Sequence, residues 1–210
     1  KMWRENHKTP DQYKLTDLEY EKEQPYEIDL APLLQRFTKR AAAAGKRFFY
    51  KVHIARGPGT LIRNKGGDTG IYRDAEYTIV LSTMATKKWL RWFLPSALIP
   101  SKCLCEQAIA CIGFEIKQKD ILVRQIQGVE GMENELKHIR WEKFLLKLVE
   151  DWALANGFEK IKVVPGNKNH WYNTSRAEIF HMRYDVTAKR SGFKFCPKEE
   201  CYVKQLIVAA

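Results

Sequence analysis

Cysteine and histidine are the side chains of this sequence that could hold a metal ion or form disulfides. The candidates are the five cysteines and the two histidines nearest to the last of them: Cys103, Cys105, Cys111, Cys196, Cys201, His170 and His181. No Cys-x-x-Cys pair occurs, and these spacings do not form a tetrahedral zinc pattern. Because an odd number of cysteines cannot all pair within one chain, we expect buried free thiols in a reducing compartment and no metal site.

Lysine and arginine give the chain a positive field that attracts anions. The sequence has 36 Lys and Arg against 25 Asp and Glu, which is a formal net charge of +11. Between Arg36 and Arg91 there are 13 basic residues and 3 acidic ones. Such a field concentrates nucleic acid, phosphorylated cofactors or acidic lipids. The charge alone does not choose among them, and a solvated basic surface without a ligand is the alternative.

The length of 210 residues predicts one domain, with residues 1–25 as a charged N-terminal arm and residues 26–210 as the body. The longest nearly apolar stretch, Trp89 to Ile99, contains Arg91 and has about 11 residues, whereas a membrane-spanning helix needs roughly 20. No basic and apolar leader begins the sequence. We therefore expect a soluble, cytoplasmic protein. The Trp89–Phe93 segment could cover the core, or bind a membrane surface or a partner.

The apolar pattern predicts both helices and strands. Apolar residues recur at intervals of three and four, which predicts helices over residues 28–44, 136–155 and 182–191. Runs of branched and aromatic residues predict strands over residues 47–55, 77–82, 159–164 and 202–208.

Two further apolar runs, residues 106–116 and 120–127, predict a β-hairpin. Its second strand, the long helix and the next strand then form a βαβ unit with a parallel strand pair. Within residues 120–127, Ile121, Val123, Gln125 and Gln127 are expected to share one face of the sheet.

This order of elements resembles the GNAT superfamily of N-acyltransferases over residues 51–208. Phe144–Val164 is similar to the crossover helix and following strand of the family, and Asn169 with Ala188–Lys194 is similar to its asparagine and its later helix ending in Gly-Phe. The resemblance implies an α/β fold with a mixed central sheet flanked by helices. It also implies acetyl-CoA or another acyl-CoA as co-substrate, and an amine on a small molecule or protein as the acceptor.

The resemblance places the diphosphate of the cofactor at the start of the long helix. The family motif there is Gln/Arg-x-x-Gly-x-Gly/Ala, and its bare N–H groups bind the diphosphate at a helix N-terminus. The matching residues in this chain are Gln125, Gln127, Gly128, Val129 and Gly131. Glu130 stands where the second glycine is expected, and alignment on the leucine pair of the helix puts Lys137–Glu142 there instead. Asn169 is expected to bind the pantetheine arm, as in the family, or to cap its own segment.

The resemblance also implies direct attack of an amine on the thioester, with a backbone N–H at the end of the 120–127 strand binding the thioester oxygen. Glu115 is expected to accept the proton of the amine, with Glu106 as the second candidate; the alternative for Glu115 is an ion pair with a nearby lysine such as Lys117. The family's proton donor, a tyrosine four residues before the glycine of Gly-Phe, corresponds to Ala188. Tyr184 lies one turn earlier on the same face, so it is either the proton donor or a core aromatic with a bonded hydroxyl.

Three functions are therefore compatible with the sequence. The first is an acyl-CoA-dependent N-acyltransferase, such as an N-acetyltransferase. The second is a catalytically silent GNAT-like protein that binds a partner through Trp89–Phe93. The third is a nucleic-acid-binding module that uses the basic Arg36–Arg91 region and its interleaved aromatic side chains.

Overall fold

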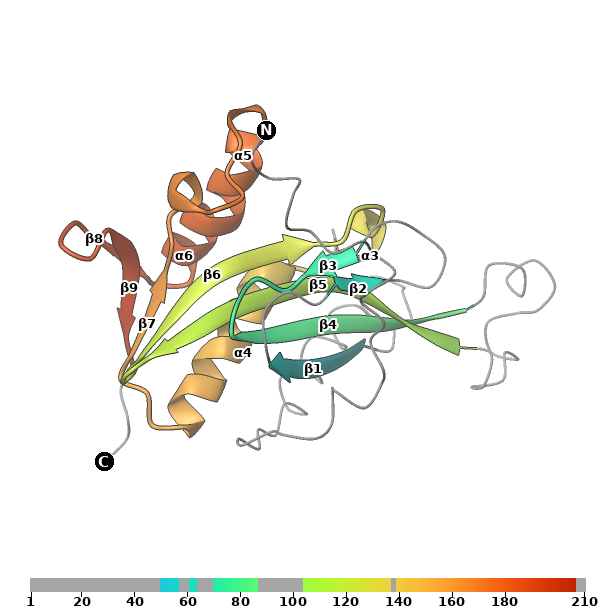
Figure 1. Ribbon diagram of the computed structural model, residues 1–210, viewed down its shortest axis with the longest axis horizontal. Helices are drawn as coiled ribbons and strands as arrows, with labels where there is room; N and C mark the ends of the chain where they lie inside the picture. Colours follow the sequence, from blue (N-terminus) through green and yellow to red (C-terminus); the bar gives the residue numbers. More distant parts are fainter. Residues whose placement is uncertain (1–49, 57–60, 64–69, 87–103, 137–138, 207–210) are drawn as a thin grey trace, which may run out of the picture.

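The structure is a computed structural model that describes residues 50–56, 61–63, 70–86, 104–136 and 139–206. These residues form a mixed α/β fold around a seven-stranded sheet, which confirms the predicted class (Figure 1). The strands follow the spatial order β1 (Tyr50–Arg56), β4 (Tyr77–Thr86), β5 (Leu104–Lys117), β6 (Asp120–Gly128), β7 (Lys160–Val163), β9 (Cys201–Gln205) and β8 (Lys194–Cys196). A separate two-stranded sheet pairs β2 (Leu61–Arg63) with β3 (Gly70–Tyr72).

The predicted hairpin is confirmed as β5 and β6. These strands pair antiparallel, and the ladder closes at Lys117 opposite Asp120. The turn between them is two residues long, and Gln118 adopts a positive φ of 58°, as tight hairpin turns require. The predicted parallel pair is also confirmed, because β6 and β7 run in the same direction and the chain between them forms helices. The sheet is therefore mixed, with one parallel pair near its middle.

Several predicted segments lie outside the described residues. They include the N-terminal arm, the helix predicted over residues 28–44, and the Trp89–Phe93 segment. The strand predicted over residues 47–55 is described from Tyr50 onward, where it forms β1, and the strand predicted at 77–82 continues to Thr86 as β4. The last predicted strand is shorter than expected, because β9 ends at Gln205.

Helix α4 (Trp141–Ala155) covers one face of the sheet and supplies much of the core. The side chains of Leu145, Leu148, Val149 and Trp152 are buried along one stripe, as the 3.6-residue period predicts. The Trp152 ring lies 5.0 Å from the Phe114 ring of β5, measured between ring centroids. This face of the sheet is therefore held by apolar and aromatic contacts.

The start of the long helix differs from the prediction. The sequence pattern predicts one helix from Leu136, but the structure has a single turn, α3 (Glu133–Leu136), and α4 begins at Trp141. Arg140 precedes α4 with a non-helical backbone, and the N–H of Trp141 donates to the carbonyl of Ile139 at 2.7 Å. The break allows the Trp141 ring to pack beneath Gly128 at the end of β6. Because the apolar periodicity of the sequence continues through the break between α3 and α4, the sequence pattern does not reveal this break.

The helix predicted over residues 182–191 begins earlier than predicted. After the 3-10 turns η5 (Gly166–Lys168) and η6 (Thr174–Arg176), helical structure runs through α5 (Ala177–Phe180), the π-helical η7 (His181–Val186) and α6 (Thr187–Arg190). Gly192 ends it with a φ of +86°, as predicted for a glycine stop. A π-helical segment inserts an extra residue, so it rotates the side chains that precede it relative to those that follow.

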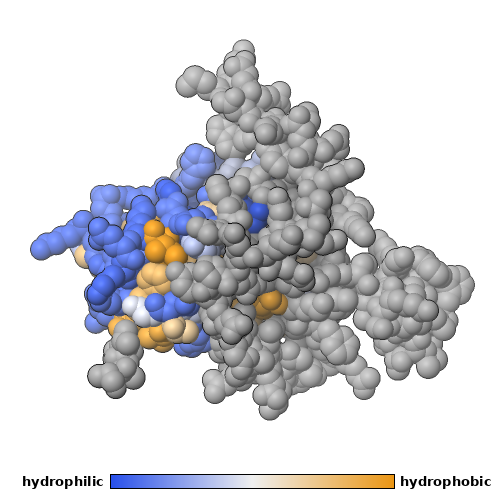
Figure 2. All heavy atoms as spheres, turned by 60° about the horizontal axis from the view of Figure 1, so that its bottom comes forward, coloured by the Kyte–Doolittle hydropathy of each residue, from blue (hydrophilic) through white to orange (hydrophobic). Residues whose placement is uncertain are grey.

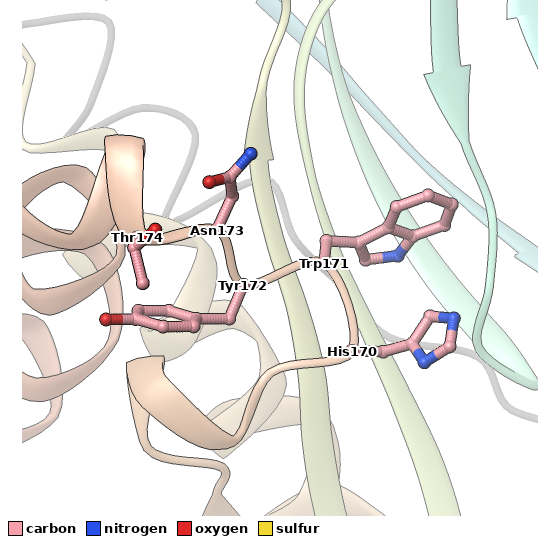
Figure 3. A pocket seen from close by; sticks show the side chains of 5 residues that line it. All are labelled: His170, Trp171, Tyr172, Asn173 and Thr174. Atoms are coloured by element: carbon pink, nitrogen blue, oxygen red, sulfur yellow. The ribbon is translucent and has the colours of Figure 1, made fainter. Parts of the chain in front are cut away.

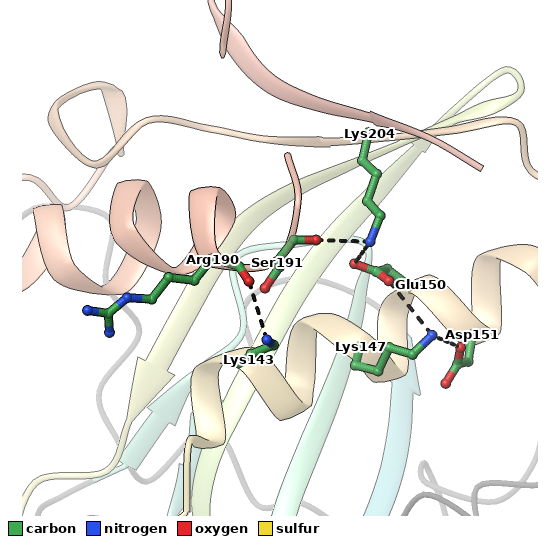
Figure 4. A network of polar contacts seen from close by, with 7 residues as sticks. All are labelled: Lys143, Lys147, Glu150, Asp151, Arg190, Ser191 and Lys204. Carbon is green, nitrogen blue, oxygen red and sulfur yellow. Dashed lines mark hydrogen bonds and ion pairs between the residues drawn. The ribbon is translucent and has the colours of Figure 1, made fainter. Parts of the chain in front are cut away.

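Polar contacts join α4 to the C-terminal elements, as Figure 4 shows. The ammonium of Lys204 in β9 donates to the carboxylate of Glu150 and to the carbonyl of Ser191, both at 2.9 Å. Lys143 donates to the carbonyl of Arg190 at 3.3 Å. Because Glu150 is buried, the Lys204 contact compensates a charge that would otherwise be costly in the interior.

On the face drawn in Figure 2, the described residues are mostly hydrophilic, and apolar ones gather in a small patch. Among the described residues, the large apolar side chains that are exposed are those of Ile179, Met182 and Phe195. Within the same part of the chain, no helix has the length and apolar character needed to span a bilayer.

Candidate functional site

Strands β6 and β7 start side by side and then separate (Figure 1). Their parallel ladder runs from Asp120 opposite Lys160 to Val123 opposite Val163. One further bond joins the N–H of Val164 to the carbonyl of Val123 at 3.1 Å. Strand β6 continues to Gly128, so beyond Val123 its edge that faces away from β5 borders an opening between the two strands. Backbone donors and acceptors on this edge need partners other than a strand.

A β-bulge at Arg124 marks the point where the opening begins. Gly113 of β5 pairs with Gln125, but the next residue, Phe114, pairs with Val123, so Arg124 has no partner opposite it. The bulge reverses the alternation of side chains along β6. The prediction that Gln125 and Gln127 share a face with Ile121 and Val123 is therefore wrong. Ile126 takes the core-facing position instead, and the two glutamines lie on the opposite face.

The hydroxyl of Tyr184 occupies the opening. The N–H of Ile126 donates to the Tyr184 hydroxyl oxygen at 2.9 Å, and this hydroxyl faces the carbonyl of Arg124 at 3.4 Å. Burial raises the pKa of Tyr184 well above its ordinary value, so the phenol keeps its proton at neutral pH. Tyr184 lies in η7, so the π-helical segment sets its direction. A buried ring with a bonded hydroxyl is the core role that the sequence offered as one alternative for Tyr184, and its role as proton donor stays a prediction.

Asn169 binds the same edge of β6. Its side-chain amide donates to the carbonyl of Arg124 at 2.7 Å, and its side-chain oxygen accepts from the N–H of Trp171 at 2.9 Å. The second of these bonds is the cap of its own segment that the sequence predicted as one alternative. Asn169 is buried, and it fixes the segment that follows η5 against the bulge.

Glu115, the predicted base, is engaged with two cations. Its carboxylate accepts from the guanidinium of Arg124 at 2.7 Å, and Lys117 lies 3.7 Å away. The ion pair with Lys117 is the alternative role that the sequence offered. Both predicted catalytic residues therefore contact Arg124. Glu115 contacts the Arg124 side chain, and the Tyr184 hydroxyl faces the Arg124 carbonyl. The role of Glu115 in proton transfer stays a prediction.

The loop predicted to bind the diphosphate uses its N–H groups internally. The N–H of Val129 donates to the carbonyl of Ile109 at 2.8 Å, and the N–H of Gly131 donates to the Glu133 carboxylate at 3.1 Å. A Cβ on Gly128 would lie 3.2 Å from the Leu136 side chain and 3.3 Å from the Trp141 ring. The space that a diphosphate would need next to Gly128 is thus filled by side chains.

The N-terminus of α4 carries an anion of its own. The carboxylate of Glu142, in the first turn, accepts from the N–H of its own residue. Partial burial raises the pKa of Glu142, while this bond and the charge of Arg183 lower it less. Arg183 also lies over the Trp141 ring, 5.6 Å from its centroid. A diphosphate approaching this helix end would meet like charge.

The remaining predicted cofactor residues, Gln125 and Gln127, form a side-chain network on the other face of the sheet. The Gln125 amide donates to the carbonyl of Tyr72 and, at 2.9 Å, to the side-chain oxygen of Gln127. Asp74, just after β3, accepts from the indole N–H of Trp171. Sequence reasoning missed Asp74 and Trp171, because they are 97 residues apart in the chain and neither belongs to a motif.

The cysteines whose side chains the structure describes carry free thiols. They are Cys111, Cys196 and Cys201. Complete burial raises the pKa of Cys111 far above its ordinary value, so its thiol is protonated and unreactive. Within the described ranges, no group of three or more His, Cys, Asp and Glu side chains is placed to hold a metal ion.

Comparison with protein-family models, with curated proteins and with solved structures found no match for this chain.

Proposed function

We propose that this chain is a GNAT-like N-acyltransferase that takes an acyl thioester into the opening between β6 and β7. The observation that carries the proposal is the Tyr184 hydroxyl, 2.9 Å from the nitrogen of Ile126 at the place where two parallel strands separate. A backbone N–H and a protonated phenol are then within reach of one small group. The strand order, with one parallel pair at its middle and a helix crossing between the pair, also supports this class.

The chemistry follows from the two groups at the opening. The thioester oxygen takes the place of the Tyr184 hydroxyl as acceptor for the N–H of Ile126, which stabilises the oxyanion as it forms. The amine nitrogen attacks the carbonyl carbon, a C–N bond forms and the C–S bond breaks. Tyr184 gives its proton to the departing sulfur. An acceptor that arrives as an ammonium ion loses two protons in all: one replaces the proton of Tyr184, and the other passes to a base and then to water, with Glu115 as the sequence-based candidate.

The filled start of α4 affects how the donor is held. With Trp141 and Leu136 against Gly128, and the Glu142 carboxylate at the helix end, the diphosphate gains little from this region. In the proposed complex the acyl and pantetheine parts of the donor supply the binding, along the edge of β6 that faces away from β5. A donor that lacks the nucleotide and diphosphate is then used nearly as well as acetyl-CoA.

The filled start of α4 also favours a second candidate, a catalytically silent GNAT-like protein that binds a partner. Such a protein has no need for an anion site at the start of α4, and Trp141 and Glu142 fill it. The nucleic-acid alternative stays a prediction from the sequence, since most of the Arg36–Arg91 region lies outside the described residues.

An assay of thiol release tests the proposal. Purified protein is mixed with a panel of primary amines and either acetyl-CoA or S-acetylpantetheine, and free thiol is measured against buffer. We expect amine-dependent release with both donors, at rates within about tenfold of each other.

Tyr184→Phe should lower this rate by about 10²–10⁴, the usual contribution of a general acid. Tyr172→Phe is the matched control, because Tyr172 lies nearby and makes a ring contact with Phe180 at 5.7 Å. Its rate should equal that of the wild type. Thiol release no faster than in buffer with either donor would favour the silent protein. Equal rates for Tyr184→Phe and the wild type would remove Tyr184 from the mechanism.

A further inference from the structure

We infer that Cys196 and Cys201 form a redox-sensitive thiol pair, a modification site at which a low-molecular-weight disulfide closes a reversible bond across the β8–β9 hairpin. The thiol pair lies at the end of the sheet opposite β1, and its chemistry is separate from acyl transfer. The inference rests on the register of the two strands and on the accessibility of both thiols.

Cys196 and Cys201 lie directly opposite each other in the antiparallel β8–β9 ladder. Opposite residues of such a ladder have Cα atoms about 4.5–5.5 Å apart, and their side chains leave the same face of the sheet. Disulfide bonds join residues whose Cα atoms are about 4.4–6.8 Å apart. The backbone of the hairpin therefore has the spacing that the bond requires.

Contacts of the next residue, Tyr202, hold this register. Tyr202 pairs with Phe195 of β8 on one side and with Val163 of β7 on the other. Its ring meets the Phe195 ring at 5.4 Å between centroids, close to edge-on. Because Tyr202 is buried, a shift of one residue would turn its ring out of the core. Packing of Tyr202 thus keeps the two thiols opposite each other.

Both thiols of the pair are accessible enough to react. Cys196 and Cys201 are half-buried, whereas Cys111 is fully enclosed. Burial raises the pKa of Cys201, and the positive charge of Lys162 lowers it less. Since the thiolate is the nucleophile, we expect the pair to react faster as pH rises.

The loop that the bond would close carries two ion pairs. Glu199 pairs with Lys162 of β7, and Glu200 pairs with Lys168 of η5. From η5 the chain continues into the segment 170–174, whose side chains line an open depression of about 480 Å³ (Figure 3). A bond at the base of the loop therefore restricts the strand ends from which both glutamates reach their partners.

Oxidation by oxidised glutathione proceeds in two exchange steps. One cysteine thiolate attacks a sulfur of the reagent, the S–S bond of the reagent breaks, and one glutathione thiolate leaves. The second cysteine thiolate then attacks the protein sulfur of this mixed disulfide and releases the second glutathione. The thiol pair is oxidised to a disulfide, oxidised glutathione is reduced to two thiols, and the two cysteine protons end on these thiols. Excess reduced glutathione reverses both steps.

Lys198 lies between the two cysteines, so a digest can identify the bond. The reduced full chain is incubated with oxidised glutathione at pH 8, remaining thiols are blocked, and the chain is cleaved after lysine without reduction. We expect residues 195–198 and 199–204 in one linked species, which dithiothreitol separates. Cys111 should stay free, because its thiol is enclosed. The absence of a link, with or without glutathione on either cysteine of the pair, overturns the inference.

A second measurement shows that the bond forms in the folded hairpin. The oxidised wild type should melt at least about 2 °C above the reduced protein, because the bond removes freedom from the unfolded chain. Cys201→Ser has no second thiol, so it should stop at the mixed disulfide on Cys196 and show no such rise. If Cys201→Ser does not fold, Cys196→Ser gives the same comparison. Linked peptides without a rise in the melting temperature would mean that the native hairpin does not accommodate the bond, which also overturns the inference.

Discussion

The hydroxyl of Tyr184 should stabilise the fold even without a ligand, because it is the acceptor for the buried N–H of Ile126. Tyr184→Phe keeps the ring, so no cavity forms, and it removes the partner of this donor. Ile126 is 2% exposed. The expected cost is that of one unpaired buried donor, about 1–3 kcal/mol in the free energy of unfolding. For a protein of this size each kcal/mol lowers the melting temperature by roughly 2–4 °C.

Urea denaturation followed by circular dichroism measures this change, and amide hydrogen exchange locates it. We expect faster exchange at Ile126 in Tyr184→Phe and little change at amides of the β5 side of β6. Tyr172→Phe should alter the free energy of unfolding by less than about 0.5 kcal/mol, because it keeps the half-buried ring and its contact with Phe180. If Tyr184→Phe is as stable as the wild type and the exchange of Ile126 is unchanged, the hydroxyl does not occupy the opening as described.

For three further substitutions, the structure predicts the direction of the change in stability. Burial raises the pKa of Glu142. The protonated carboxyl therefore contributes to stability in full at a pH below its ordinary pKa of 4.5, and this contribution is lost as pH rises through the folded pKa. Glu142→Gln should therefore melt higher than the wild type at pH 7 and not at pH 4; a lower melting temperature at pH 7 would contradict this. The hydrogen bond with Lys162 lowers the pKa of Glu199. The ionised Glu199 therefore contributes to stability above its ordinary pKa of 4.5, and this contribution is lost as pH falls through the folded pKa. Lys162→Met should flatten the fall in melting temperature between pH 6 and pH 3, and an unchanged slope would refute the assignment. Gly113→Ala should cost about 1–3 kcal/mol, the usual price of overpacking, because its Cβ would lie 2.8 Å from the Gln125 oxygen; equal urea midpoints would show that the two segments are not in contact.

Regular periodicity explains which elements could be predicted. The β5–β6 hairpin and the body of α4 have apolar spacings of two and of three to four residues over long stretches, so their type and order follow from the sequence. The parallel pairing of β6 and β7 follows from the helix between them. These features rest on local patterns that tertiary contacts reinforce.

The details of the site depend on contacts that no local pattern contains. The bulge at Arg124 changes the face of Gln125 and Gln127, and its signal in the sequence is only that Ile126 breaks the alternation. Trp141 packs against Gly128 because the helix stops and restarts between Leu136 and Trp141, although the apolar spacing continues through the break. Tyr184 reaches β6 through a π-helical segment, which has no recognisable sequence signature.

The most direct test of the central claim is an NMR titration of the full chain with S-acetylpantetheine. The amide resonance of Ile126 is followed together with that of Gly131. If the thioester enters between β6 and β7, its carbonyl replaces the Tyr184 hydroxyl, and the Ile126 amide should shift in a saturable way while Gly131 changes little. An Ile126 resonance that does not move at millimolar thioester, or shifts confined to residues far from β6, would contradict an acyl-binding role for this opening.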